Sequence, residues 1–230
     1  MRTIDVTRLS DLLVSQSLFA DCSEDELKEI AERGTTARHA PGTEIMAQGE
    51  VGDAVYVVLS GIARVSLMAA NGREIVLDYA EAGEVLGEIA MIDGGERTAS
   101  VSAFTDCEML RLSRAAFTEI VVRHPPMAMR LLQAMARRLR QGNATLEAER
   151  AYSSGPRLAR FLLRLMVGEG GEGRLKLSLS QSELGNFAGM SREQINRQIS
   201  AWVDGGIVAR ENGQVKILDR AMLMEVADEW

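Results

Sequence analysis

The sequence predicts an α+β protein with a roll of short antiparallel strands, one long helix, and a small helical domain with a hairpin. Residues 35 to 113 hold short β-branched runs split by Gly and Asn-Gly, a pattern typical of a compact antiparallel barrel or roll. After Pro125-Pro126, no proline occurs until Pro156. Two capping-box signatures around a glycine turn then predict a pair of short helices. We expect domains over residues 1–121, 122–153 and 154–230.

The first half of the chain begins with a predicted helix and continues with predicted strands. Ser23 followed by Glu26 is a capping box, which predicts a short amphipathic helix over 25–31. Asn71-Gly72 predicts a type I′ hairpin between two of the strands. The predicted strands cover 55–59, 63–67, 74–77, 101–102 and 109–112.

A narrow apolar stripe runs along the predicted long helix over 127–153. Its members, separated by three, four and seven residues, are Leu132, Met135, Leu139 and Leu146, with Gly142 in the vacant position. Such heptad spacing predicts a helix that pairs with its copy in a second subunit, and hence a homodimer through residues 127–153. The alternative is an amphipathic helix that packs on its own barrel.

The last part of the chain predicts a winged helix-turn-helix. Ser153-Ser154-Gly155-Pro156 is a hinge by composition, and we expect a helix over 157–167, a loop over 168–173 and a strand over 175–179. Two short helices follow, from Ser180 to Ala188 and from Ser191 to Gly205-Gly206, with a tight turn at Gly189-Met190. The wing is predicted over 207–210 and 214–218, and a last helix starts at Asp219.

The loop over residues 87–98 combines groups suited to a nucleotide. Arg97 with the adjacent hydroxyl of Thr98 and exposed backbone amides can hold one small phosphate. Glu88 would repel phosphate, so it is better placed to accept hydrogen bonds from sugar hydroxyls. The alternative is a glycine-rich turn whose Arg97 and Glu88 pair on the surface.

The second of the two short helices carries residues that can read DNA bases. The N-terminal residues of such a helix reach base edges in the major groove. Arg192 and Arg197 can each donate two hydrogen bonds to guanine, and Glu193 can accept from cytosine. The alternative is a solvated charged face. We expect the DNA-contacting residues to be Ser180, Gln181, Ser191, Arg192, Glu193, Asn196 and Arg197.

Composition and residue spacing exclude several other functional classes of protein. The net charge of −7 hides an asymmetry: residues 1–110 carry 8 Lys and Arg against 20 Asp and Glu, and residues 111–230 carry 18 against 13. Only the basic second half is therefore expected to meet phosphate backbones. Cys22 and Cys107 lie far apart in the sequence, which excludes a metal site with recognisable ligand spacing. His39 and His124 also lie far apart, in expected loops, and give no pattern of a catalytic triad. We expect a cytoplasmic protein without a membrane span, without a cofactor, and without enzymatic activity.

The order of these parts resembles the CRP/FNR superfamily of bacterial transcription regulators over about residues 15–228. The register of Gly87, Glu88, Arg97, Thr98 and Ala99 is similar to the phosphate-binding cassette of its cyclic-nucleotide-binding β-roll, a double-stranded β-helix of the jelly-roll type. The resemblance implies that Glu88 binds the ribose 2′-hydroxyl, that Arg97 and Thr98 bind the cyclic phosphate, and that Gly87 and the Ile89 amide lie at the phosphate side. The haem and iron–sulfur branches need N-terminal ligands that this chain lacks.

The string Ser191-Arg192-Glu193 with Arg197 is similar to the catabolite-activator branch, whose members bind a TGTGA-type half-site. The branch's two adenine contacts on the dimer helix fall on Gly142 and Asn143. Asn143 can still read a purine edge, because it has both a donor and an acceptor. Gly142 has no side chain that could contact the base. The alternative is that Gly142 merely lets the two helices approach closely.

The resemblance implies a homodimeric regulator of double-stranded DNA that is gated by a cyclic mononucleotide, cyclic AMP first and cyclic GMP second, and that works with RNA polymerase. The alternative is the same fold acting without a nucleotide, or sensing another effector such as cyclic di-GMP.

Overall fold

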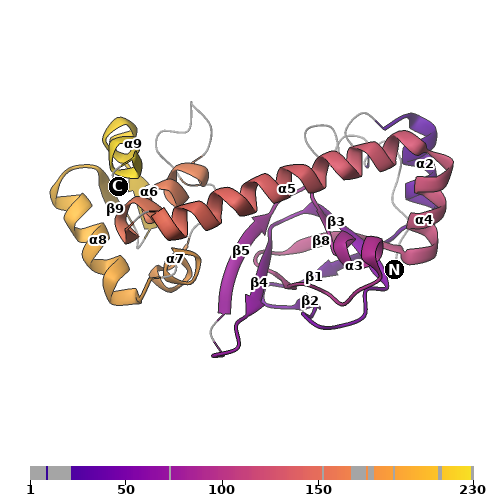
Figure 1. Ribbon diagram of the computed structural model, residues 1–230, viewed down its shortest axis with the longest axis horizontal. Helices are drawn as coiled ribbons and strands as arrows, with labels where there is room; N and C mark the ends of the chain where they lie inside the picture. The colour runs from indigo at the N-terminus through magenta and orange to yellow at the C-terminus, as the bar shows by residue number, and fades with distance from the viewer. Residues whose placement is uncertain are drawn as a thin grey trace. The chain divides into compact units, whose positions relative to one another are not determined.

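The computed structural model describes residues 9, 22–72, 74–151, 153–166, 175, 179–188, 190–211 and 214–228. The chain divides into two compact units, Met1–Leu139 and Arg140–Trp230, and the boundary falls inside the long helix α5 (Pro125–Ala151) (Figure 1). In the described part of the chain, no helix combines the length and the apolar character needed to cross a membrane.

The first unit contains two four-stranded antiparallel sheets that form a roll, as the sequence predicts. The strand orders are β1-β8-β3-β6 and β2-β7-β4-β5. All five predicted strands are confirmed, and β1, β2 and β6 are additional. The strands are β1 (Thr35–His39), β2 (Glu44–Met46), β3 (Ala54–Ser60), β4 (Ala63–Met68), β5 (Glu74–Ala80), β6 (Val85–Leu86), β7 (Ser100–Ala103) and β8 (Cys107–Ser113).

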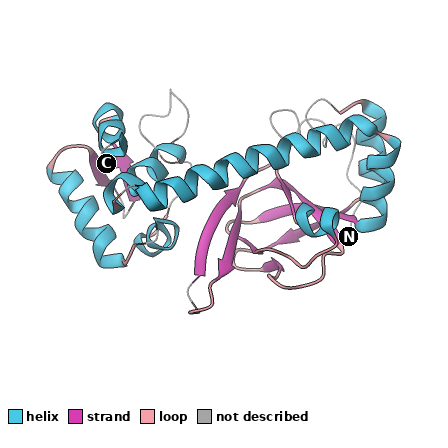
Figure 2. Cartoon of the chain, viewed as in Figure 1, coloured by secondary structure: helices cyan, strands magenta, loops and turns pink. Residues whose placement is uncertain are grey.

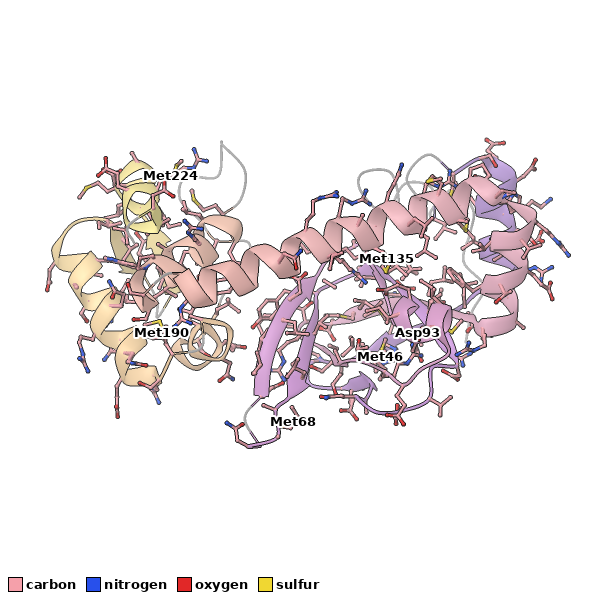
Figure 3. All side chains as sticks on the ribbon, viewed as in Figure 1. Met46, Met68, Asp93, Met135, Met190 and Met224 are labelled. Carbon is pink, nitrogen blue, oxygen red and sulfur yellow. The ribbon has the colours of Figure 1, made fainter. Side chains whose placement is uncertain are left out.

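Strand β3 is buried on both faces, which explains its continuous apolar sequence. Successive side chains of a strand point to opposite faces of the sheet. Val55 and Val57 belong to a core cluster shared with the helices of this unit. Val58 belongs to a second cluster, with Met46 and Met109, inside the roll. Figure 3 shows Met46 in this position between the sheets.

The predicted hairpin is present, but its turn is longer than predicted. Met68 of β4 pairs with Glu74 of β5, so residues 69–73 connect the strands where a type I′ turn would use two. The amide of Gly72 donates to the carbonyl of Ala69 over 2.9 Å, and Gly72 has a positive φ of 78°. The Asn-Gly pair thus marks the hairpin correctly, whereas the position of the turn depends on pairing between the strands.

Helices cover one end of the roll, where α2 (Glu24–Arg33) and α4 (Arg114–Arg123) lie side by side (Figure 1). The predicted capping box is confirmed, since Ser23 N donates to Glu26 Oε2 over 2.7 Å and Glu26 N donates to Ser23 Oγ over 3.3 Å. His124 lies between α4 and α5, as expected, but His39 ends strand β1, so its predicted loop position is wrong.

The first half of α5 packs on the roll and also keeps an exposed apolar stripe. Met127 and Leu131 are buried in the core cluster, and Met135 packs against it. Figure 3 shows Met135 directed from α5 toward the strands. Met135 of the predicted stripe is therefore half-buried against the roll of its own subunit, and its contact with a second subunit stays a prediction. The exposed apolar residues of this stretch are Met129, Leu132 and Leu139, with exposed fractions of 59%, 62% and 67%.

The second unit is a small helical domain with a two-stranded wing (Figure 2). Its elements are α6 (Ser154–Arg164), α7 (Gln181–Ala188), α8 (Arg192–Asp204), β9 (Val208–Glu211), β10 (Gln214–Ile217) and α9 (Arg220–Asp228). The wing and the last helix confirm the prediction. The predicted loop over 168–173 lies outside the described residues, and of the predicted strand over 175–179 only Leu175 is described in a bridge, antiparallel to Met166.

The predicted hinge is largely helical. Helix α6 starts at Ser154, so Gly155 and Pro156 lie in its first turn and are buried. Proline is compatible with the first turn of a helix because the amides there have no partner within the helix. The Ser, Gly and Pro residues that indicate a hinge are therefore also compatible with the start of a helix. The predicted helix start at Arg157 is three residues too late.

Both capping boxes of the helix pair are confirmed. Ser191 N donates to Gln194 Oε1 over 2.8 Å, and Gln194 N donates to Ser191 Oγ over 3.2 Å. The pair at Ser180 and Glu183 has the same reciprocal bonds. The two helices approach closely at Gly185, where an added Cβ would lie 2.7 Å from the carbonyl oxygen of Met190.

Candidate functional site

The loop over 87–98 connects strand β6 to strand β7 around one short helix. Gly87 follows β6 in the left-handed conformation, with φ of 80°, and α3 (Glu88–Asp93) begins directly after it. Gly94, with φ of 75°, ends this helix. Glu96 then forms a bridge with Val51, and Arg97 and Thr98 lead into β7.

The guanidinium of Arg97 is buried and held mainly by backbone carbonyls. Its side chain is 3% exposed. Nη1 donates to the Gly87 carbonyl over 2.7 Å, and Nη2 donates to the Ala54 carbonyl over 2.6 Å. Among the described residues, the carboxylate found beside it is that of the exposed Asp53, whose Oδ1 lies 3.4 Å from Nη2. Burial of a cation without close charge compensation is costly, which makes this a favourable place for an anion.

Asp53 is shared with a second arginine. Asp53 Oδ2 accepts from Nη2 of Arg111 over 2.5 Å. Burial by itself lowers the pKa of Arg111, but hydrogen bonds with Tyr56 and Asp53 outweigh this effect and raise it. Asp53 is thus mainly the partner of Arg111, and the charge of Arg97 is left only partly balanced.

The absence of a side chain at Gly87 leaves the space that the guanidinium of Arg97 occupies. A Cβ at Gly87 would lie 2.3 Å from Arg97 Nη1 and 3.2 Å from Cζ, so no side chain fits there while Arg97 keeps its position. The left-handed backbone at this residue is a second reason for glycine.

Gly87→Ala is therefore expected to destabilise the protein and to displace Arg97, whereas Gly94→Ala should only destabilise it. Gly94 is an excellent control because it has nearly the same φ and an added Cβ would meet nothing within 4 Å. Each change should cost about 1–2 kcal/mol of backbone strain. Thermal unfolding and calorimetric titration with cyclic AMP would separate the two effects. Equal nucleotide affinity of the two variants would contradict this role of Gly87.

Glu88 is the most deeply buried carboxylate of the loop, at 1% exposure. Its Oε1 accepts a hydrogen bond from Nη1 of Arg138 on α5. Its Oε2 is buried and has no hydrogen-bond partner among the described residues. A buried carboxylate oxygen without a partner is expensive, and a hydroxyl donor from a ligand would satisfy it.

Arg138 is a site residue that the sequence analysis missed. It bridges the loop and the long helix, since Nη1 donates to Glu88 and Nη2 donates to the Val85 carbonyl. The only sequence signal is a cationic residue on the helix that follows the roll. Fifty residues separate Arg138 from Glu88, and no spacing rule connects them.

The structure thus brings a buried cation and a buried carboxylate together at Gly87, because Arg97 donates to the carbonyl of Gly87 and Glu88 follows it in the chain. The alternative that Arg97 and Glu88 pair on the surface is wrong, because both are buried and the bonds found for them go to other partners. Thr98 and Ile89 are exposed at the same loop. A buried, partly balanced cation near a carboxylate acceptor suits a ligand with one phosphate and a sugar hydroxyl.

Two predicted ligand-contacting positions lie in the second unit. Gly142 and Asn143 follow Leu139 on α5, and both are exposed. An added Cβ at Gly142 would meet nothing within 4 Å. Their contact with a nucleotide stays a prediction.

Helix α8 presents the predicted base-reading residues on one exposed surface. Ile195, Ile199 and Trp202 are buried at 0%, 1% and 4% exposure. The residues on the other faces of its first turns are exposed, namely Arg192, Glu193, Asn196 and Arg197. Ser180 and Ser191 are exposed and cap the two helices, and the side chain of Gln181 lies outside the described ones.

The comparisons with known proteins agree with this geometry. A family model described as a cyclic nucleotide-binding domain matches residues 37–124. A second one, described as a Crp-like helix-turn-helix domain, matches residues 156–226. In the described residues there is no group of three or more side chains that could hold a metal ion.

Relatives over most of the chain are transcription regulators. The cyclic AMP receptor protein of Thermus thermophilus is 35% identical over 186 residues, which are 81% of this chain and 85% of that protein. A CRP-like cAMP-activated global transcriptional regulator of Mycobacterium tuberculosis is 28% identical over 94% of this chain and 98% of that protein. The crystal structure of the Thermus thermophilus catabolite activator protein matches with a TM-score of 0.54 and 32% identity, over 91% of this chain and 97% of that one. This chain therefore belongs to the CRP/FNR family of transcription regulators, with a cyclic-nucleotide-binding domain followed by a Crp-like helix-turn-helix.

Proposed function

We propose that the cassette binds a cyclic mononucleotide, cyclic AMP first and cyclic GMP second, and that binding gates recognition of DNA. The observation that carries this proposal is the pairing of a buried, partly balanced Arg97 with a buried Glu88 whose Oε2 has no partner. A ligand with one phosphate charge and a neighbouring hydroxyl satisfies both groups.

Each cassette residue has one role in this proposal. Glu88 accepts from the ribose 2′-hydroxyl, and Arg97 and the exposed Thr98 donate to the cyclic phosphate. The backbone amides at Gly87 and Ile89 lie at the phosphate side. The phosphate supplies the negative charge that the exposed Asp53, 3.4 Å from Arg97, provides only in part.

The DNA-binding form is proposed to be a homodimer formed through α5. The exposed apolar residues Met129, Leu132 and Leu139 follow one another at spacings of three and seven residues, which place them on one seam of a helix pair. The side chain of Leu146, predicted for the same seam, lies outside the described ones. Two recognition helices then read the halves of a TGTGA-type palindrome, and RNA polymerase is the partner on DNA.

The gate is proposed to work through Arg138. Its hydrogen bond to Glu88 joins the cassette to α5, the helix that would carry the dimer seam. A ribose hydroxyl at Glu88 changes that bond, and α5 thereby acquires an interaction that differs between the ligand-free and ligand-bound states. Such a difference is what a population shift requires.

Calorimetry of the full chain with cyclic AMP, cyclic GMP and cyclic di-GMP tests the proposal. Tighter binding of cyclic AMP than of the other two supports it. Binding of cyclic di-GMP alone, or of none, favours the same fold with another effector or with no nucleotide.

Asn143→Ala is expected to narrow the difference in affinity between cyclic AMP and cyclic GMP more than it weakens either one. Asn143 carries both a donor and an acceptor, and the neighbouring Gly142 offers no side chain to share in reading the base. The measurement is a titration of wild type and variant with both nucleotides. Equal losses for the two ligands would show that Asn143 does not read the base.

A further inference from the structure

Arg210 of strand β9 connects the wing to the recognition helix α8 through side-chain hydrogen bonds. Its Nη2 donates to three acceptors on that helix. The distances are 2.7 Å to Asn196 Oδ1, 3.2 Å to the Asn196 carbonyl and 3.1 Å to Ser200 Oγ. Two of the three bonds are therefore to Asn196, which is one of the residues proposed above to face DNA.

The chemistry of the two side chains fixes the orientation of the amide. A guanidinium has only donors, so the Asn196 atom that faces it over 2.7 Å is the carbonyl oxygen and not the amino nitrogen. The main-chain bond and the Ser200 bond hold Arg210 against the helix, so that the amide cannot turn over without losing a charge-assisted hydrogen bond.

Asn196 occupies the part of α8 where a side chain meets base edges. It lies one turn after Arg192 and directly before Arg197, and all three are exposed. On a helix of 3.6 residues per turn, Asn196 points to one side of Arg197, on the flank that Arg210 approaches from the wing.

We propose that Arg210 determines the base specificity of Asn196, an inference that rests on the proposed DNA-binding function. Asparagine reads adenine by a pair of hydrogen bonds, accepting from N6 through Oδ1 and donating to N7 through Nδ2. Arg210 takes up one of the two lone pairs of Oδ1, and its positive charge disfavours a second donor, such as adenine N6, at the same oxygen. Asn196 therefore meets a base mainly through the donors of Nδ2. It favours a base that presents acceptors in the major groove, as guanine does with N7 and O6, and it disfavours cytosine, which presents a donor.

Arg210 acts here as a positioning residue, because it works through Asn196. A cation that served only as a phosphate contact would raise the affinity for every sequence alike. A residue that fixes the amide changes the preference at one base pair of each half-site. This difference separates the two roles in one experiment.

The experiment measures the affinity of the full chain, with saturating cyclic AMP, for a library of palindromes randomised at the half-site positions. The base pair read by Asn196 is the one whose preference changes in Asn196→Ala. In Arg210→Ala, the affinity for adenine at that position relative to guanine should rise about tenfold, the low end of what a bidentate pair discriminates. In the double variant the preference at this position should equal that of Asn196→Ala alone.

Lys216→Ala is the matched control, since Lys216 lies on the other wing strand and pairs with Glu211 over 3.2 Å. It removes one positive charge from the wing and should leave all base preferences unchanged. Thermal unfolding of each variant checks the fold, and Arg210→Met is a second variant, because methionine keeps much of the length of the side chain but has no hydrogen-bond donor. A wild type that prefers certain bases, together with unchanged preferences in Arg210→Ala and Arg210→Met, would overturn this inference alone. A wild type without any sequence preference would overturn the proposed DNA recognition and this inference with it.

Discussion

Arg97→Ala is expected to weaken the binding of cyclic AMP by about ten- to a hundredfold or more, while the variant remains folded. The side chain of Arg97 is 3% exposed, and the carboxylate found beside it in the described part of the chain is 3.4 Å away, so a bound phosphate would be its main charged partner. Hydrogen bonds to charged groups contribute about 1.5–3 kcal/mol each, and the variant loses them all at this position.

Arg38→Ala is the matched control for Arg97→Ala. Arg38 lies on β1 of the same unit and is exposed, so its loss changes the charge equally without touching the cassette. Calorimetric titration should give wild-type affinity for the control. Unchanged affinity in Arg97→Ala would show that the phosphate is not bound at this arginine.

Arg197→Ala is expected to cost about 1–3 kcal/mol of binding free energy on a TGTGA-type palindrome, as for the loss of one guanine-reading pair. Arg197 is exposed in the second turn of α8, close to the N-terminal end that enters the major groove. Non-specific binding at low salt should survive, because it depends on phosphate contacts from the many cations of the second half.

Arg220→Ala serves as the control for the loss of charge in this unit. Arg220 is exposed at the start of α9, outside the helix pair. Band shifts on the palindrome and on a scrambled sequence distinguish the two variants. A loss of affinity that is the same on both sequences would mean that Arg197 contacts phosphate and does not read a base.

Signals that lie within a few residues of one another predicted much of the fold. The capping boxes at Ser23 and Ser191 each place the two interacting side chains three residues apart, and both helices start where predicted to within a residue. The short β-branched runs between Gly and Asn-Gly likewise predicted five strands of the roll, because both the runs and the turn residues that bound them are local signals.

Errors arose where one composition suits two structures. Ser153 to Pro156 is compatible with both a flexible link and a helix start, and burial of Gly155 and Pro156 in α6 decides between them. Met135 falls on the predicted dimer stripe by spacing, but it also packs, half-buried, against the roll of its own subunit. Neither outcome can be read from local periodicity.

The candidate site likewise combines local features, which the sequence predicted, with long-range contacts, which it did not. The residues of the cassette share one short loop, so their order in the chain indicated their chemistry. The contacts of Glu88 with Arg138 and of Asn196 with Arg210 connect residues 50 and 14 positions apart. Such contacts depend on how separate elements pack, and the sequence alone did not predict either of them.

The central claim is that a cyclic nucleotide gates sequence-specific binding to DNA. The most direct test is the affinity of the wild-type chain for a TGTGA-type palindrome, with half-sites about 34–36 Å apart, measured with and without cyclic AMP. A scrambled palindrome of the same composition is the control. We expect tight binding to the palindrome only with cyclic AMP, and weak, salt-sensitive binding in the other cases. Equal affinity for both sequences at saturating cyclic AMP, or the same affinity for the palindrome with and without it, would contradict the claim.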